Sequence, residues 1–140
     1  MPGIEPAVPP LHGSPADDAP EVLVIRGLLD RWADAIARHD PGAVADVFTP
    51  DALFQGFDPT PGYGRQYISA YYDKQPIGLT ADYELLSVRV LAPTVTVAYA
   101  SVLFERPDGP VPVYLTVVAR KDPDASWALT HYHVSPLMGT

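Results

Sequence analysis

The spacing of apolar residues changes once along this chain, near Thr80, and this change constrains the fold more than any other sequence feature. From Glu21 to His39, apolar residues recur three or four positions apart, which predicts a helix with one buried face. The residues with this spacing are Val22, Ile25, Leu29, Trp32 and Ile36. After Thr80 the apolar residues alternate, which predicts strands at about 82–91, 95–105, 113–121 and 127–135. Because the connections are short, neighbouring strands are expected to pair antiparallel.

Shorter elements are predicted between the long helix and the alternating strands. Asp40 and Pro41 are typical of a helix start, so a short second helix is expected to run through Phe48. An edge strand at 52–55, an irregular loop at 56–64 and a third helix at 65–74 complete the set. Helices that precede a meandering sheet define an α+β domain.

The composition favours one domain and excludes several functional classes. The chain has 140 residues and a formal charge of −8, which opposes binding to nucleic acid and to anionic membranes. It has no cysteine, so disulfides and thiol nucleophiles are excluded. The first 20 residues are rich in proline and lack lysine and arginine, so we expect a disordered leader at 1–20 and one domain at 21–140. Because no run resembles a signal peptide or a membrane span, a cytoplasmic location is expected.

The strand predicted at 95–105 has no face that is clearly suited to water. One face carries Val95, Val97, Tyr99, Ser101 and Leu103, and the other carries Thr96, Ala98, Ala100, Val102 and Phe104. Three short helices cover only one side of a sheet. We therefore expect a second copy of the chain to cover the other side, which gives a homodimer through the sheet face.

Several features occur in a characteristic order along the chain. They are the helix with Trp32, the short second helix, Asp51-Ala52-Leu53-Phe54, Gly64 four residues before Ile68, and the series Trp127-x-Leu129-x-His131-x-His133-x-Ser135. In this order, residues 21–137 resemble the nuclear-transport-factor-2-like superfamily, and within it the SnoaL-like and SgcJ/EcaC-type bacterial proteins.

The resemblance implies a cystatin-like α+β barrel, in which a cone-shaped, curved antiparallel sheet wraps around three N-terminal helices. It also implies an internal ligand pocket, a dimer, and a role in bacterial natural-product metabolism, such as polyketide or enediyne antibiotic biosynthesis. Its members include cyclases, isomerases, dehydratases, ligand-binding proteins and association domains, so the fold alone does not identify the function.

Pro93-Thr94 and Asp108-Gly109 are read as two-residue hairpin turns, and they predict a strand register that gathers polar groups around two histidines. This register aligns Tyr114 with His133 and Thr116 with His131 on one face, which we expect to line the inside of the cone. Other residues expected to line the pocket are Trp32, Phe54, Phe57, Tyr71, Tyr99, Ser101 and Leu103. The loop at 56–64 is either the closing mouth of the cone or an ordinary surface connection.

Two functions fit such a site. A desolvated His131 or His133 stays neutral near pH 7 and can act as a general base, while Tyr114 donates to a developing enolate. This chemistry is that of a cofactor-free isomerase, cyclase or dehydratase acting on a small apolar, oxygenated molecule. The alternative is a non-catalytic carrier of an apolar aromatic or polyene ligand, for which the chain has many aromatic residues. A third hypothesis, a purely structural domain, predicts no pocket.

Neither a metal nor a cofactor is expected. The two histidines have only Glu84 as a further candidate ligand, and a protein metal site needs at least three ligands. Carboxylates are also nearly absent from the predicted strands, so a carboxylate base is not expected.

Overall fold

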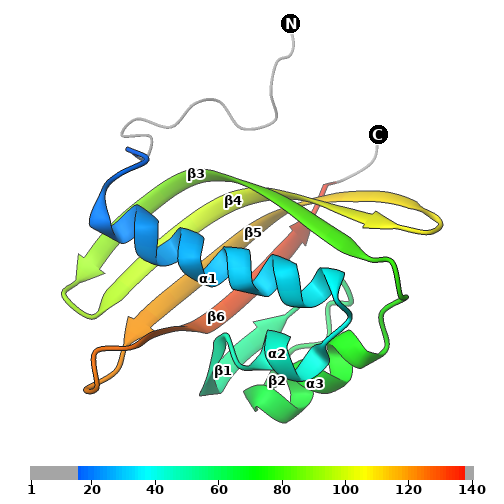
Figure 1. Ribbon diagram of the computed structural model, residues 1–140, viewed down its shortest axis with the longest axis horizontal. Helices are drawn as coiled ribbons and strands as arrows, with labels where there is room; N and C mark the ends of the chain where they lie inside the picture. The colour runs from blue at the N-terminus through cyan, green and yellow to red at the C-terminus, as the bar shows by residue number, and fades with distance from the viewer. Residues whose placement is uncertain (1–15, 138–140) are drawn as a thin grey trace, which may run out of the picture.

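The computed structural model describes residues 16–137 and confirms the α+β class. The elements are α1 (Pro20–Ala37), α2 (Pro41–Ala45), β1 (Phe48–Gln55), β2 (Gly62–Tyr63), α3 (Gly64–Asp73), β3 (Thr80–Ala92), β4 (Val95–Arg106), β5 (Gly109–Lys121) and β6 (Trp127–Pro136). The strands form a curved, unclosed sheet in the order β2-β1-β6-β5-β4-β3, and α1 lies across one of its faces (Figure 1). This face is called the inner face and the opposite one the outer face. The predicted leader falls largely on residues 1–15, outside the described residues.

Helix α1 forms for the reason that the sequence indicates. All five residues of the predicted stripe are buried, and Leu28 and Ala35 extend the same face. Helix α2 begins as predicted, with the Asp40 side chain accepting a hydrogen bond of 3.1 Å from the Ala43 N–H. None of the described helices is long and apolar enough to cross a membrane.

The predicted second helix and edge strand are wrong in their extent. Helix α2 ends at Ala45, and Phe48 already belongs to β1, which pairs in parallel with β6 through Phe48 and Leu129. The Leu129 N–H donates to the Val47 carbonyl at 2.9 Å. This pairing joins segments about 80 residues apart, so no local pattern reveals it. The edge position belongs to β2, which pairs with β1 through Leu53 and Tyr63.

The faces of β4 and β5 that were expected to be inner and outer are exchanged. The inner face consists of Thr96, Ala98, Ala100, Val102 and Phe104 on β4 and of Val113, Leu115, Val117 and Ala119 on β5, all of them buried. Both faces of β4 are apolar, so its own pattern does not decide between them. The large side chains of α1 decide instead, because small alanines opposite them let the helix pack closely on the sheet.

The β4–β5 hairpin also turns one residue earlier than predicted, which shifts the pairing of the two strands by two residues. Arg106 pairs with Gly109, so the turn residues are Pro107 and Asp108 rather than Asp108 and Gly109. A slip of two residues keeps every side chain on its face. Tyr114 therefore pairs with Ser101, and the predicted polar group stays together, but on the outer face.

Candidate functional site

The histidines predicted to face the pocket lie on the outer face of β6, so the expected placement is wrong. His131 pairs with Val118 and is half-buried, whereas His133 pairs with Thr116 and is exposed. Side chains alternate along a strand, so the residue between them, Tyr132, points inward and is 1% exposed.

The other predicted members of this group lie on the outer face as well. Tyr114 stacks on Tyr99, with ring centroids 5.6 Å apart and an interplanar angle of 26°. Ser101, Leu103 and Thr116 occupy the same face of β4 and β5 and are half-buried. Tyr114, Ser101 and Leu103 line an open groove on this outer face. The catalytic assignment of His131, His133 and Tyr114 stays a prediction.

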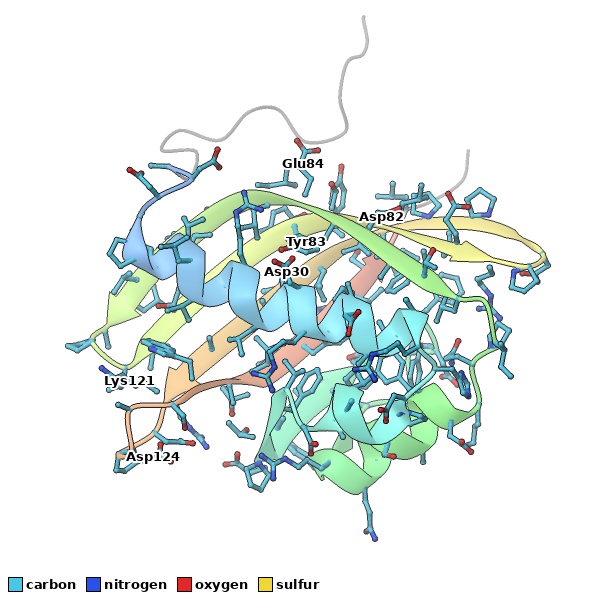
Figure 2. The ribbon with its side chains drawn as sticks, viewed as in Figure 1. Asp30, Asp82, Tyr83, Glu84, Lys121 and Asp124 are labelled. Carbon is cyan, nitrogen blue, oxygen red and sulfur yellow. The ribbon has the colours of Figure 1, made fainter. Side chains whose placement is uncertain are left out.

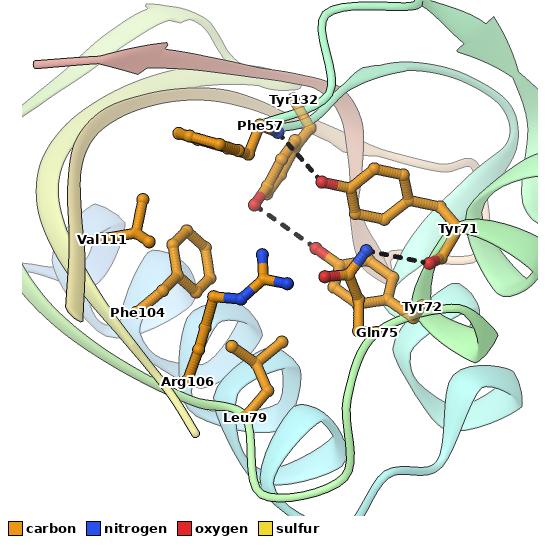
Figure 3. A pocket seen from close by; sticks show the side chains of 9 residues that line it. All are labelled: Phe57, Tyr71, Tyr72, Gln75, Leu79, Phe104, Arg106, Val111 and Tyr132. Carbon is orange, nitrogen blue, oxygen red and sulfur yellow. Dashed lines mark hydrogen bonds between the residues drawn. The ribbon is translucent and has the colours of Figure 1, made fainter. Parts of the chain in front are cut away.

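The interior contains a small cavity between α3, the loop after β1 and the β4–β5 hairpin, which we call the mouth pocket (Figure 3). Its lining residues are Phe57, Tyr71, Tyr72, Gln75, Leu79, Phe104, Arg106, Val111 and Tyr132. The volume open to the centre of a water molecule is about 20 Å³, which is room for roughly one water. Of the predicted ligand contacts, Phe57 and Tyr71 line this pocket.

Trp32 and Phe54, also predicted as contacts, lie directly behind the lining. Phe54 stacks on Tyr132 with centroids 4.4 Å apart and an angle of 10°, and it meets Tyr71 edge-on at 4.9 Å. Trp32 contacts Tyr132 at a centroid distance of 5.8 Å. Each such pair adds about 0.5–1.5 kcal/mol beyond its buried area, so this wall of the pocket is held firmly.

A chain of hydrogen bonds runs from the core into the mouth pocket. Trp32 Nε1 donates to Tyr72 Oη at 3.1 Å, and Tyr72 Oη donates to Tyr132 Oη at 3.3 Å. The Tyr132 hydroxyl thus accepts one bond and keeps its own proton for a further acceptor. Burial raises the pKa of both Tyr72 and Tyr132 above the ordinary value of 10, so both phenols stay protonated and act as donors.

The loop after β1 covers one side of the mouth pocket. The Phe57 N–H donates to Tyr71 Oη at 3.0 Å, and the Phe57 ring is 42% exposed. Gly56 makes this approach feasible, because a Cβ there would lie 2.5 Å from Tyr71 Oη. Burial raises the pKa of Tyr71, which keeps its hydroxyl protonated. The structure thus fixes Phe57 at the pocket entrance through a contact with α3.

Arg106 brings a positive charge into this aromatic pocket. It occupies the inward-facing position that follows Phe104 on β4, and Figure 3 shows its guanidinium directed into the cavity toward Tyr72 and Gln75. Its Nε is buried and has no hydrogen-bond partner among the described residues. The nearest carboxylate oxygen, Asp108 Oδ1, lies 3.5 Å from Nε, outside hydrogen-bonding geometry.

Sequence reasoning missed Arg106, Gln75, Tyr72 and Tyr132 as pocket residues. The predicted strand ends at residue 105, whereas β4 continues to Arg106. The alternation of inward and outward side chains places this additional residue inside. Tyr132 was missed because the prediction placed its neighbours His131 and His133 inside, which puts Tyr132 on the outer face. As a set, the pocket lining offers hydroxyl, amide and guanidinium donors, and it contains neither a carboxylate nor an imidazole.

Comparison with solved structures defines the fold class. An NTF2-like protein with a cystatin-like fold from Novosphingobium aromaticivorans is 17% identical with a TM-score of 0.70, and the match covers 86% of this chain and 84% of that one. A ketosteroid isomerase-like protein from Erwinia carotovora atroseptica is 18% identical, with a TM-score of 0.72 over 86% and 98% of the two chains.

A third structure, from Xanthomonas campestris, is assigned to the association domains of calcium/calmodulin-dependent protein kinase II. It is 22% identical, with a TM-score of 0.75 over 91% of this chain and 96% of that one. At these identities the comparisons establish the cystatin-like, NTF2-like fold and no shared activity. A search of curated proteins gives no significant match.

The family follows from the sequence itself. Residues 25–139 match the model of the SnoaL-like domain, which is most of the chain. The protein therefore belongs to the SnoaL-like domain family, as the ordered motifs indicate.

Proposed function

We propose that this protein binds a small, largely apolar and oxygenated molecule in the mouth pocket without transforming it. The observation that carries the proposal is the donor set in an aromatic cavity: the Tyr132 hydroxyl and the Arg106 guanidinium both point into it. Natural small-molecule sites combine mostly apolar walls with a few placed polar groups, and this lining has that composition.

Binding requires the pocket to open, because the cavity holds only about one water. Phe57 is the lining residue best placed to move. Phe57 is 42% exposed, and the two hydrogen bonds that tie its loop to α3 do not involve its ring: they run from the Phe57 N–H to Tyr71 Oη and from the Tyr67 hydroxyl to the Thr60 carbonyl. We propose that a flat ligand ring takes the place of the Phe57 ring against the aromatic wall.

Binding is favoured over catalysis because the lining has no proton acceptor suited to enolisation. Burial raises the pKa of its three phenols, Tyr71, Tyr72 and Tyr132, so they stay protonated and act as donors rather than as bases. The predicted base, His131 or His133, lies on the other side of the sheet. The natural-product role and the cytoplasmic location stay predictions from the sequence and from the family resemblance.

The proposal includes a homodimer through the outer face of the sheet. That face carries half-buried apolar side chains on β4 and β5, among them Val97, Tyr99, Leu103 and Val118. An isologous contact between two copies would remove them from water. Sedimentation velocity tests this part: Leu103→Arg should convert a dimer to a monomer, and a wild-type monomer at all concentrations would refute it.

Titration with 2-naphthamide, a flat neutral probe with one carbonyl, tests the binding site. We expect changes in the ¹H–¹⁵N spectrum at Phe57, Tyr71 and Tyr132, and recovery of unchanged amide after long incubation. Val111→Trp should fill the pocket and abolish binding, while Val90→Trp, at an exposed position of β3, should not.

Val111→Phe serves as a smaller pocket filler, should the tryptophan variant fail to fold. Binding that survives a folded filler variant would refute the site. Chemical conversion of the amide would refute the carrier role.

A further inference from the structure

We infer that the mouth pocket selects ligands that carry a carboxylate, with Arg106 as the residue that recognises it. This inference rests on the proposed function and deepens it, because it names the chemical class of the ligand. A guanidinium fork matches the two oxygens of a carboxylate and binds them with parallel charge-assisted hydrogen bonds.

The positive charge of Arg106 is poorly compensated within the fold. A buried Nε without a partner is costly, and native proteins rarely keep such an atom without a reason. The closest carboxylate belongs to Asp108, whose side chain is 82% exposed, and ion pairs with so exposed a partner contribute little. The guanidinium therefore retains most of its capacity to bind an anion.

The fold places the guanidinium of Arg106 in the pocket rather than in water. The Arg106 side chain is only 31% exposed, although it lies at the end of a hairpin where an arginine can extend into water. Figure 3 shows it turned inward instead, toward Tyr72 and Gln75. In a pocket bounded by aromatic rings, water screens a charge less than it does at the surface, so attraction to an opposite charge is stronger.

The other polar groups that line the pocket also favour an anion, because they offer hydrogen-bond donors. Arg106 is a donor only, and the Tyr132 hydroxyl keeps a free proton after accepting from Tyr72. Gln75 Nε2 donates to the Tyr71 carbonyl at 3.3 Å and thus helps to fix that side chain at the rim. A site with these donors and no lining carboxylate fits an anionic oxygen group and disfavours a cation.

The experiment compares two probes of equal shape, 2-naphthoate and 2-naphthamide, by isothermal titration calorimetry on the full chain. We expect the wild-type protein to bind the carboxylate about 10- to 150-fold more tightly than the amide, the range for charge-assisted hydrogen bonds. Arg106→Gln should remove this preference and leave the amide affinity within about twofold, while Arg106→Lys should retain part of it.

Lys121→Gln is the matched control, because it removes one positive charge at the C-terminal end of β5, the end away from the β4–β5 hairpin that carries Arg106 (Figure 2). Its carboxylate preference should equal that of the wild-type protein. Thermal unfolding confirms that each variant is folded before titration.

The outcomes separate the two proposals. Equal affinity for the two probes in the wild-type protein overturns the carboxylate inference and leaves the binding function intact. An unchanged preference in folded Arg106→Gln overturns the role of Arg106. Binding of neither probe overturns the proposed function and the inference that rests on it.

Discussion

Replacing Leu115 with alanine, next to a matched replacement of Thr116, tests which face of the sheet forms the core. The two residues are neighbours on β5, so their side chains point to opposite faces. Leu115 is 0% exposed and belongs to the core, whereas Thr116 lies beside His133 on the outer face.

The expected magnitudes differ clearly. Leu→Ala at a fully buried site costs about 2–5 kcal/mol, because it combines lost burial with a residual cavity. A loss near 3 kcal/mol lowers Tm by roughly 10 °C for a domain of this size. Thr116→Ala removes no hydrogen bond found among the described residues, so its cost should stay below about 1 kcal/mol, the span of strand propensities.

Urea unfolding followed by the fluorescence of buried Trp32 measures both values. The series is run at several protein concentrations, because an outer-face dimer would add stability at high concentration. If Thr116→Ala costs as much as Leu115→Ala at the lowest concentration, the assignment of inner and outer faces is refuted. Wild-type m-values in both variants would show that the unfolding reaction itself is unchanged.

Three further predictions concern the core and its tyrosines. Ala100→Leu should destabilise the fold by about 1–3 kcal/mol, because the added volume enters a buried, filled site on the inner face; a denaturation midpoint at or above the wild-type value would contradict this packing. Tyr132→Phe leaves the Tyr72 hydroxyl without its acceptor and should cost about 1–3 kcal/mol in urea unfolding, whereas a neutral result would refute the hydrogen-bond chain. Burial, together with a 2.6 Å hydrogen bond to Asp30, raises the pKa of Tyr83 to about 12 (Figure 2). In the unfolded chain this phenol ionises at about pH 10. The stabilisation that its hydrogen bond gives to the fold is therefore complete below that pH and is lost as the pH rises through about 12. The stability advantage of wild type over Tyr83→Phe should therefore shrink across this interval, and an advantage that grows would contradict the sign.

Much of the fold could be predicted because its signals are local. The helical stripe with Trp32 identifies α1, Asp40 marks the start of α2, and Pro93-Thr94 forms the predicted β3–β4 turn, with Ala92 pairing with Val95. The ordered motifs also indicate the family, which the family match confirms. These features depend on residues that are close in sequence.

The missed features depend on contacts between distant segments. The parallel pairing of β1 with β6 and the choice of inner face are both set by tertiary packing, which the alternation of β4 does not encode. The site depended on that choice, so the prediction placed His131 and His133 inside and overlooked Tyr132 between them. Of the predicted ligand contacts, Phe57 and Tyr71 line the mouth pocket because they belong to the loop and the helix that bound it.

A crystal structure of the protein with 2-naphthoate tests the central claim most directly. We expect the naphthalene ring in the mouth pocket in place of the Phe57 ring, with the carboxylate within hydrogen-bonding distance of the Arg106 guanidinium. A naphthoate bound on the outer face beside His131 and His133, with the mouth pocket still closed by Phe57, would contradict it.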